Sequence, residues 1–571
     1  MFSMLGCRGA GEDPTMVSRV TAPLSRRTLL KLGGAAAAAS TLGLGPDEGL
    51  ANGDAPSKPV AVKRGGTFRL RMNQPPVHFD PHQTAAYSTM VPLSFAYNRL
   101  VKVQNGSSVA PGTQPIEGDL ADSWDRQGET VYVFKLRKGI RWHLKPPVNG
   151  RELTADDVKY TYERLLATKG SSNQPILEMV DKVEAPDKYT VKFTLKEPNV
   201  WFVDRLASTS TWIVARECVE KHGDLTKWES VVGTGPWMLE RYEPTTKMTF
   251  VRNPNYFQSG LPYVDAVELT VDPDPASAFA TFLAGKYDFG PESGMAVRRS
   301  DLGAAKKKIG WYLQTRELLI DFGGLAAMKL DQDPFKDVRV RRAIAMADNW
   351  HEVLEHNVLS TGKGAPNPLI PAALKEWSLP IDKLPPEGRK LYEADPAGAR
   401  QLLAEAGHKS GIAIPVETTA GYGPDWMDAV NIEVKNWKAA GLQVDLKVKD
   451  HSAFMSSSLQ GKFDKMLLTQ RDGPIDPDWY LTPLLPGHPL NWSGVNDPKL
   501  TEMIKLQRRT DKEKKRREIV YDIQRHFSQQ VYFTFGASVS AVATWMPYVR
   551  DFGPNIGPDY GGRLVAAWLD K

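Results

Sequence analysis

The chain has 571 residues, of which 41% are hydrophobic and 24% charged, with a formal net charge of +5. This is the composition of a globular protein with room for about two to four domains. The charge is small and Lys and Arg are spread along the chain, so the basic surface that nucleic-acid binding requires is missing, and we predict no nucleic-acid partner. The basic run at 512–517 alternates with acidic residues and is typical of a solvated helix face.

The N-terminus predicts export. Residues 25–32, SRRTLLKL, precede an Ala- and Gly-rich run, a pattern typical of a twin-arginine secretory signal. With Lys31 inside it, this run is too short and too weakly apolar for a spanning helix of about 20 residues. We predict that residues 1–55 are a signal peptide and linker, and that the protein is periplasmic, exported by the twin-arginine route. The alternative is a chance basic pair before an Ala-rich helix.

The number of cysteines limits the disulfides and thiolate metal sites that the chain can form. The chain has two cysteines, and Cys7 lies in the predicted signal, so the mature chain keeps only Cys218. Neither an internal disulfide nor a thiolate metal cluster is expected.

The first half of the mature chain predicts short strands and one well-marked helix. Strands are predicted from alternating or β-branched runs at residues 65–73, 132–143, 189–196 and 247–253. The segment 154–168 predicts a helix with Thr154 as N-cap, and Asp156 and Asp157 in the first turn favour the helix dipole.

From about residue 335 onward the helical signal strengthens. In the segment 395–407, Asp395 is the predicted N-cap, Pro396 takes the first turn and Gly407 ends the helix. Predicted strands then alternate with helices such as 425–440, at residues 412–419, 442–449 and 464–470. That alternation is typical of an α/β layer arrangement.

No motif in the sequence predicts an enzyme. The string HEVLEH at 351–356 resembles a zinc motif, but its histidines are five positions apart rather than four, so they face different sides of a helix. We predict instead that His351 lies in the core or at its boundary, on a stripe with Ile344, Ala347, Leu354 and Val358. Phosphate-binding loops and serine-hydrolase elbows are missing, so we predict no catalytic residue, no metal and no cofactor. A glycosidase-type carboxylate pair gives no sequence signal and stays open.

Several segments occur together in an order that is informative. The longest is LADSWDRQGETVYVFKLRKGIRWHLKPPVNGRELTADDVKYTYERL at 120–165. The others are GTGPWMLERYEP (233–244), VRNPNYF (251–257), GLPYVDAVEL (260–269), LAGKYDFG (283–290), FKDVRVRRAIAMADN (335–349), ADPAGARQLLAEAG (394–407), NWKAAGLQVDL (436–446) and DPDWYLTPLL (476–485). In this order they resemble the family 5 extracellular solute-binding proteins, which serve ATP-driven importers and include dipeptide-, oligopeptide- and nickel-binding proteins.

The resemblance implies an α/β fold of two lobes, the type II-like periplasmic-binding-protein fold with an extra inserted domain. The ligand cleft lies between the lobes, which close about a hinge. Carried onto this chain, the core of lobe 1 comprises residues 62–98, 233–310 and 530–571, the inserted domain is 99–232, and lobe 2 is 311–529. The two glycines of GTGPW would then allow backbone conformations that larger residues resist, or form an ordinary tight turn.

The same resemblance implies the periplasmic substrate-binding component of an ABC importer. It would bind a peptide or peptide-like solute without chemistry and deliver it, as a monomer, to membrane permease subunits. An alternative within the fold is another ligand: a nickel chelate, haem, an opine or an oligosaccharide. The ten histidines show no cluster that favours nickel. An alternative of another class is a periplasmic enzyme exported by the twin-arginine route.

In peptide-binding relatives an aspartate after a strand of the second lobe pairs with the α-amino group of the ligand. Asp472 matches this position best, with a one-residue insertion that leaves the register against Asp476 open. We predict that Asp476 caps a short helix beginning at Pro477 and that Asp478 is structural too. Arg471 is a weaker candidate for a ligand carboxylate, because its side chain should point away from that of Asp472.

Aromatic residues beside Gly-rich loops complete the predicted site. Tyr422 and Trp426 follow a second-lobe strand, and His82 and Tyr97 hold corresponding places in the first lobe. Such side chains supply flat apolar walls with a polar handle. The alternative for each is an ordinary core residue.

Overall fold

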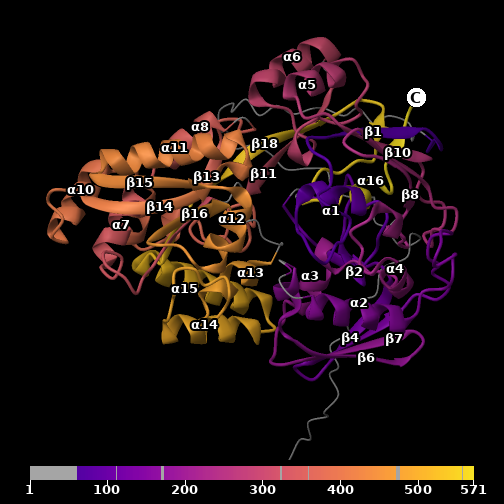
Figure 1. The fold of residues 1–571 in the computed structure, drawn as a ribbon, viewed down its shortest axis with the longest axis horizontal. Helices are drawn as coiled ribbons and strands as arrows, with labels where there is room; N and C mark the ends of the chain where they lie inside the picture. The colour runs from indigo at the N-terminus through magenta and orange to yellow at the C-terminus, as the bar shows by residue number, and fades with distance from the viewer. Residues whose placement is uncertain are drawn as a thin grey trace, which may run out of the picture. The chain divides into compact units, whose positions relative to one another are not determined.

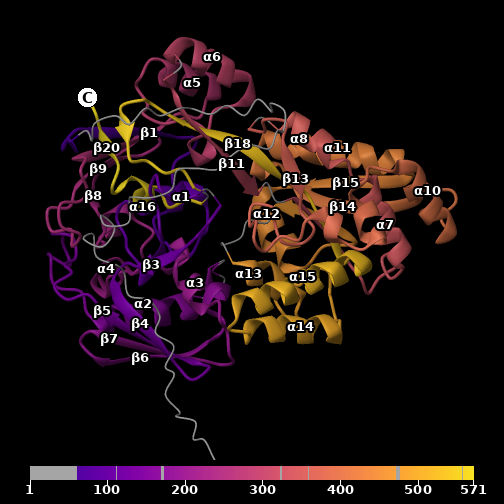
Figure 2. The same cartoon turned by 180° about the vertical axis from the view of Figure 1, so that it is seen from behind.

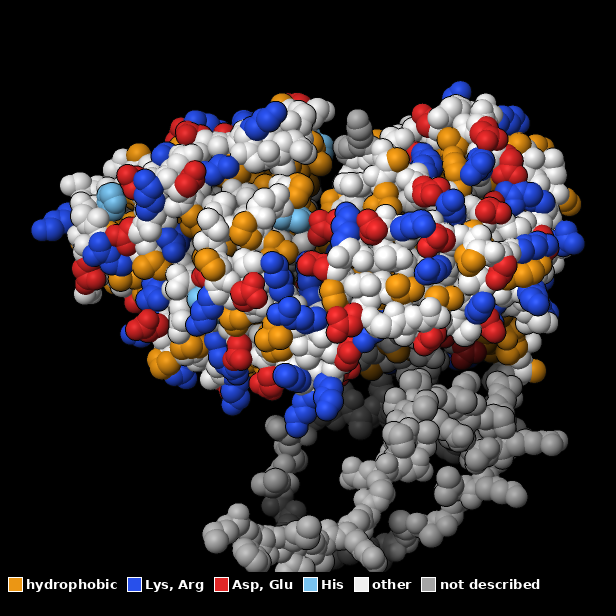
Figure 3. Space-filling view, turned by 90° about the horizontal axis from the view of Figure 1, so that it is seen from below, with side chains coloured by type: hydrophobic (Ala, Val, Ile, Leu, Met, Phe, Trp, Pro, Cys, Tyr) orange, Lys and Arg blue, Asp and Glu red, His pale blue; other side chains and the backbone are white. Residues whose placement is uncertain are grey.

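A computed structural model describes residues 61–571, except residues 111, 169, 170, 172, 311, 322, 323, 358, 471–475 and 556 and the side chains of 320, 321 and 424. The predicted signal at 1–55 therefore lies outside the described residues. Within the described part of the chain, none of the helices combines the length and apolarity that crossing a membrane requires. On the face seen in Figure 3, basic and acidic side chains are interspersed.

The N-terminal sheet has four strands, each of which is labelled in Figure 1 or Figure 2. Their order is β1 (Thr67–Met72), β10 (Ala266–Val271), β9 (Lys247–Arg252) and β8 (Trp237–Glu243). β1 runs parallel to β10, with Thr67 opposite Ala266, and the other pairs are antiparallel. Alternate residues of β1 are buried, because successive side chains of a strand point to opposite faces. Three helices belong to the same region of the chain: α1 (Tyr87–Leu93), α5 (Pro275–Leu283) and α6 (Arg299–Ile309).

A second antiparallel sheet is built from the segment between β1 and β8. Its order is β4 (Ala121–Gln127), β5 (Val131–Leu136), β7 (Thr190–Leu195) and β6 (Val180–Asp187). The predicted strand at 132–143 is shorter than expected, because the chain turns after Leu136 through Gly139, whose φ is +76°. The same segment contains β2 (Val101–Val103), β3 (Ile116–Gly118), α2 (Ala155–Ala167), α3 (Phe202–Leu206) and α4 (Arg216–His222).

The predicted cap of α2 is confirmed. The Asp157 carboxylate accepts a hydrogen bond from the Thr154 N–H at 2.9 Å and completes a capping box. The N-terminal sheet and the second sheet share one apolar core, which we call the N-terminal core. It also includes residues near the C-terminus such as Trp545 and Leu569.

The third sheet is buried on both faces at its central strands. Its order is β15 (Leu442–Lys449), β14 (Ile412–Thr419), β16 (Met466–Gln470), β12 (Gly324–Met328) and β17 (Phe533–Phe535), with β14 parallel to β15 and β16. In β12, Ala326 and Met328 belong to one apolar cluster and Leu325 and Ala327 to another, as the period of two requires.

Helices cover each face of this sheet (Figures 1 and 2). The first cluster includes residues of α7 (Val338–Ala347), α10 (Pro396–Glu405) and α11 (Pro424–Ala439). The second includes residues of α13 (Pro477–Leu481), α14 (Pro498–Arg508) and α15 (Glu513–Gln530). The expected α/β layer arrangement is confirmed, and the predicted N-cap Asp395 accepts a hydrogen bond from the Gly398 N–H at 2.8 Å.

Two long strands run between these cores. β11 (Gln314–Asp321) pairs antiparallel with β18 (Ala537–Trp545), and β13 (Gly364–Pro366) adds to the other edge of β18. Leu313 and Trp545 belong to the N-terminal core, whereas Leu325 and Phe533 belong to a core of the third sheet. β11 and β18 therefore carry the chain from one set of cores to the other.

The prediction for His351 is wrong. Its side chain is exposed and stacks on Trp350, with ring centroids 3.5 Å apart. The predicted stripe assumed one continuous helix, but α7 ends at Ala347, Asp348 is extended, and Asn349 caps a separate helix, α8 (Trp350–His356). The break changes which residues share a face.

Candidate functional site

The predicted anchor segment joins two described elements. β16 ends at Gln470 and α13 begins at Pro477, while Arg471 and Asp472 lie outside the described residues. The Asp476 carboxylate accepts a hydrogen bond from the Trp479 N–H at 3.0 Å, so its predicted role as the N-cap is confirmed.

Tyr422 lies beside the end of β16. Its hydroxyl is 3.2 Å from Oγ1 of Thr469, the penultimate residue of that strand. Its half-buried ring meets those of Trp426, His451 and Phe454 edge to face, at centroid distances of 5.8, 5.5 and 6.1 Å. The ring is therefore held rigidly next to the strand that leads to Asp472.

Trp426 lies deeper than Tyr422. Its side chain is 2% exposed, and its Nε1 donates a hydrogen bond to Oγ1 of Thr418 at 3.2 Å. It supports the Tyr422 ring from within the apolar cluster that includes α11. The structure thus brings the two predicted aromatic residues of the second lobe together.

His82 and Tyr97 are buried in the N-terminal core. Nε2 of His82 is 3.2 Å from the Trp212 carbonyl oxygen, and Nδ1 is 2.8 Å from the Arg164 guanidinium. Burial and the Arg164 charge lower the pKa of His82 to about 4. The ring of Tyr97 stacks on Trp212. Since both ring nitrogens of His82 already have protein partners, the geometry gives no support to ligand contact by this residue.

The GTGPW segment packs against the chain just after α1. A Cβ added to Gly233 or Gly235 would lie 1.8 Å from the Ala96 carbonyl oxygen or 2.4 Å from the Ala96 carbonyl carbon, respectively. Neither glycine has a positive φ. Close backbone approach, rather than an unusual conformation, is therefore what requires glycine here.

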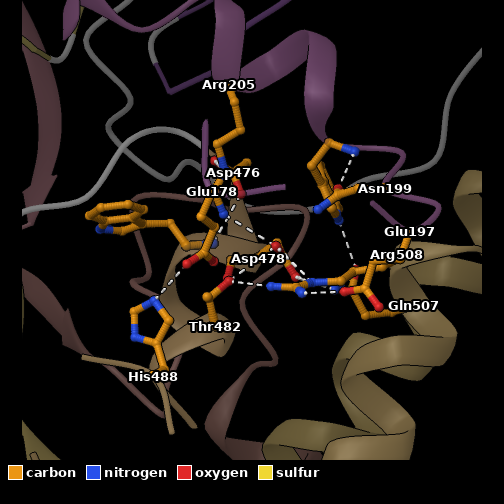
Figure 4. A network of polar contacts seen from close by, with 12 residues as sticks. Glu178, Glu197, Asn199, Arg205, Asp476, Asp478, Thr482, His488, Gln507 and Arg508 are labelled. Atoms are coloured by element: carbon orange, nitrogen blue, oxygen red, sulfur yellow. Dashed lines mark hydrogen bonds and ion pairs between the residues drawn. The ribbon is translucent and has the colours of Figure 1, made fainter. Parts of the chain in front are cut away.

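A buried group of charges joins α3 to α13 and α14 (Figure 4). We call Arg205, Asp476, Asp478 and Arg508 the junction cluster. Arg205 places Nε 3.0 Å from the Asp476 carboxylate and a terminal nitrogen 3.2 Å from that of Asp478. Arg508 donates from Nε to Asp478 at 2.9 Å. The four side chains are between 0% and 6% exposed.

The two aspartates of the junction cluster differ electrostatically. Burial raises the pKa of Asp476 to about 6, and the neighbouring Asp478 carboxylate adds to this rise against the opposing charge of Arg205. Burial also opposes ionisation of Asp478, but the charges of Arg508 and Arg205 outweigh it and lower the pKa of that carboxyl. Asp478 is therefore held as a carboxylate between two guanidinium groups.

Sequence reasoning missed Arg205 and Arg508. Arg205 lies 273 residues before Asp478, and no local pattern connects them. The sequence offered one signal: Asp478 closely follows Asp476, although capping the helix requires only one aspartate.

Residues 115–491 match the model of the bacterial extracellular solute-binding proteins, family 5. The chain belongs to this family. Its members are solute-binding proteins rather than enzymes. The family 5 chain is 27% identical over 515 residues to "Di/tripeptide-binding protein 1" of Pseudomonas aeruginosa. The aligned region covers 84% of this chain and 90% of that relative.

Solved structures show the same fold. The ABC transporter-associated periplasmic binding protein DppA of Helicobacter pylori, in complex with the peptide STSA, is similar to this family 5 chain with a TM-score of 0.73 and 20% identity. AgaA from A. tumefacien R10, in complex with agropinic acid, has the same TM-score and 22% identity. In both comparisons 89% of this chain and 99% of the other are covered. The two-lobed α/β fold expected from the sequence is confirmed.

Proposed function

We propose that the protein is the substrate-binding component of an ABC importer and binds a short peptide between its lobes. The observation that carries this proposal is the family match over residues 115–491. The di/tripeptide-binding relative, aligned over most of both chains, supports a peptide as the ligand. After binding, the closed protein would present the peptide to membrane permease subunits as a monomer.

The two proposed lobes correspond to the two groups of apolar cores, that of the N-terminal and second sheets and those of the third sheet. One lobe comprises residues 62–310 with the C-terminal segment, including the inserted domain 99–232, and the other comprises 311–529. The strand pair β11 and β18 supports this division, because it runs between the cores and supplies the place where a hinge would bend. β17 lies after residue 529 but pairs in the third sheet, so we place the return to the first lobe after Phe535.

The proposed ligand anchor is Asp472, with Tyr422 as a wall. Tyr422 beside Thr469 supports this choice, since an aromatic face next to the strand end can cover the backbone of varied peptides without reading their side chains. The α-amino group of a peptide would pair with Asp472, and closure would remove water from both charges. Asp476 is a poorer choice, because the Arg205 guanidinium already faces its carboxylate. Arg471 stays a weaker candidate for the carboxylate end of the peptide.

We also propose that residues 1–55 direct export to the periplasm by the twin-arginine route. The Ser-Arg-Arg-x-Leu-Leu-Lys pattern supports this, and the family description, extracellular solute-binding, agrees with an exported protein.

An opine-like ligand is the second candidate. The structural likeness to AgaA, whose ligand is agropinic acid, favours it. An aromatic wall such as Tyr422 can cover the apolar part of either ligand and does not by itself select between them.

Calorimetry of the Asp472→Ala variant tests the proposed anchor. We expect trialanine to bind the wild-type protein and to lose at least about 30-fold in affinity in the variant, because a buried charge partner is removed. Asp445→Asn, which changes an exposed residue of β15, is the matched control and should bind as the wild type does. Unchanged affinity in Asp472→Ala would refute this anchor, and no binding to the wild type would count against the peptide.

A further inference from the structure

The segment 178–205 contacts the segment 476–516 at several points besides the junction cluster. Nε1 of Trp201 donates to Oε1 of Gln507 at 2.7 Å, and the Val200 N–H donates to the Arg508 carbonyl oxygen at 2.9 Å. His488 and Glu178 lie 3.3 Å apart (Figure 4). The first segment belongs to the proposed inserted domain and the second to the proposed second lobe. These contacts therefore cross from one lobe to the other.

The junction cluster is buried and brings two basic and two acidic side chains together. Arg205 and Arg508 carry two positive charges, and Asp476 and Asp478 carry two negative charges when ionised. Asp478 has additional partners: Thr482 and Gln507 donate hydrogen bonds to its carboxylate. If one guanidinium were removed, the carboxylates would stay buried without their counter-charge, which is strongly unfavourable. If the two segments separate instead, water hydrates each group.

A second ion pair crosses the same junction at the surface. Arg126 and Asp511 are 2.6 Å apart, but their side chains are 30% and 61% exposed. Solvent screens such a pair, so its loss changes little. The junction thus contains a buried ionic contact and an exposed one that can be compared directly.

We propose that the junction cluster is a latch between the inserted domain and the second lobe, in which Arg205 engages Asp476 and Asp478 when the lobes close. This inference rests on the proposed function, because it assumes lobes that open and close around a solute. The planar fork of Arg205 reaches both carboxylates at once, which a point charge cannot do, and so fixes α13 in one position. Arg205 is therefore a positioning residue: it holds the helix that follows Asp472 in the chain and lengthens the life of the closed form.

The distance between the lobes tests the latch directly. Spin labels on cysteines that replace the exposed Lys182 and Lys505, in a Cys218→Ala background, report this distance by pulsed EPR with and without trialanine. We expect a short distance in the wild-type background that is depleted in Arg205→Gln and retained in Arg126→Gln. Trialanine should dissociate about 100-fold faster from Arg205→Gln, with little change in association rate, whereas Arg126→Gln should stay within about fivefold of the wild type.

Each outcome decides the proposal. Equal distances and equal dissociation rates in Arg205→Gln and wild type would overturn the latch, as would equal effects of the two arginine variants. If Arg205→Gln does not fold, Trp201→Phe removes the hydrogen bond to Gln507 and weakens the contacts of the ring with Trp377 and Arg516 across the same junction. It should shift the distance in the same direction by a smaller amount, and no shift would overturn the latch. If trialanine fails to bind the wild type while the distance still depends on Arg205, the latch stands and the peptide proposal fails.

Discussion

Replacing Trp426 by alanine should lower the free energy of unfolding by about 3–5 kcal/mol. The side chain is 2% exposed, so nearly all of its apolar surface leaves water on folding. It packs in the cluster between α11 and the third sheet, and its ring lies perpendicular to that of Tyr422. Removing it would leave a cavity behind Tyr422, and the Thr418 hydroxyl would lose its donor.

Two milder variants separate the contribution of the buried ring from that of the hydrogen bond. Trp426→Phe keeps most of the ring and loses the hydrogen bond to Thr418, so about 1–3 kcal/mol is expected. Tyr422→Phe keeps the ring and removes only a hydroxyl of a half-buried residue, so we expect about 1 kcal/mol or less.

Urea unfolding followed by far-UV circular dichroism measures these differences as shifts in midpoint at constant slope. A loss below about 1 kcal/mol in Trp426→Ala would refute the reasoning, because it would mean that the indole faces open space as a pocket wall.

Three further predictions follow from the close packing, the buried carboxylates and the signal. Gly233→Ala should destabilise the protein by about 3 kcal/mol or more in urea unfolding, since the added Cβ would overlap the Ala96 carbonyl. The control Gly303→Ala, which adds a Cβ in open space on α6, should be neutral or stabilising. Equal stabilities of the two variants would contradict this packing. Asp476 faces Arg205, Asp478 and Asp204, and burial raises its pKa to about 6, so closure should take up protons near pH 6, and this gain for the closed form should be lost as the pH rises through 6. Burial also raises the pKa of Asp204, to about 7, so Asp204 can add to the uptake. Calorimetry of trialanine binding in two buffers measures the uptake, and an undiminished uptake in Asp476→Asn would contradict the assignment. Changing both Arg26 and Arg27 to Lys should retain the precursor in the cytoplasm, as fractionation would show; normal export would refute the twin-arginine route.

Local signals in the sequence were sufficient for the helix starts. Thr154, Asp395 and Asp476 were predicted as N-caps because a cap depends on residues within three or four positions. The strands of the third sheet were found for a related reason, since apolar runs such as 464–470 are needed to bury both faces.

Contacts between segments that lie far apart in the chain could not be predicted from such local signals. Nothing near Arg205 in the chain distinguishes it from other arginines until α3 and α13 meet. His351 was misplaced because the expected period ran across Asp348, where the backbone is extended. His82 was proposed as a flat side chain in a place corresponding to those of Tyr422 and Trp426, and the guanidinium and carbonyl partners of its ring nitrogens come from the distant residues 164 and 212.

The central claim, that this family 5 protein carries a peptide, is tested most directly by native mass spectrometry of the protein purified from the periplasm. We predict bound masses that match short peptides and disappear from the Asp472→Ala variant, with the exposed Asp445→Asn variant loaded as the wild type is. Bound masses of an opine, a haem or another non-peptide compound in place of peptides would contradict the claim.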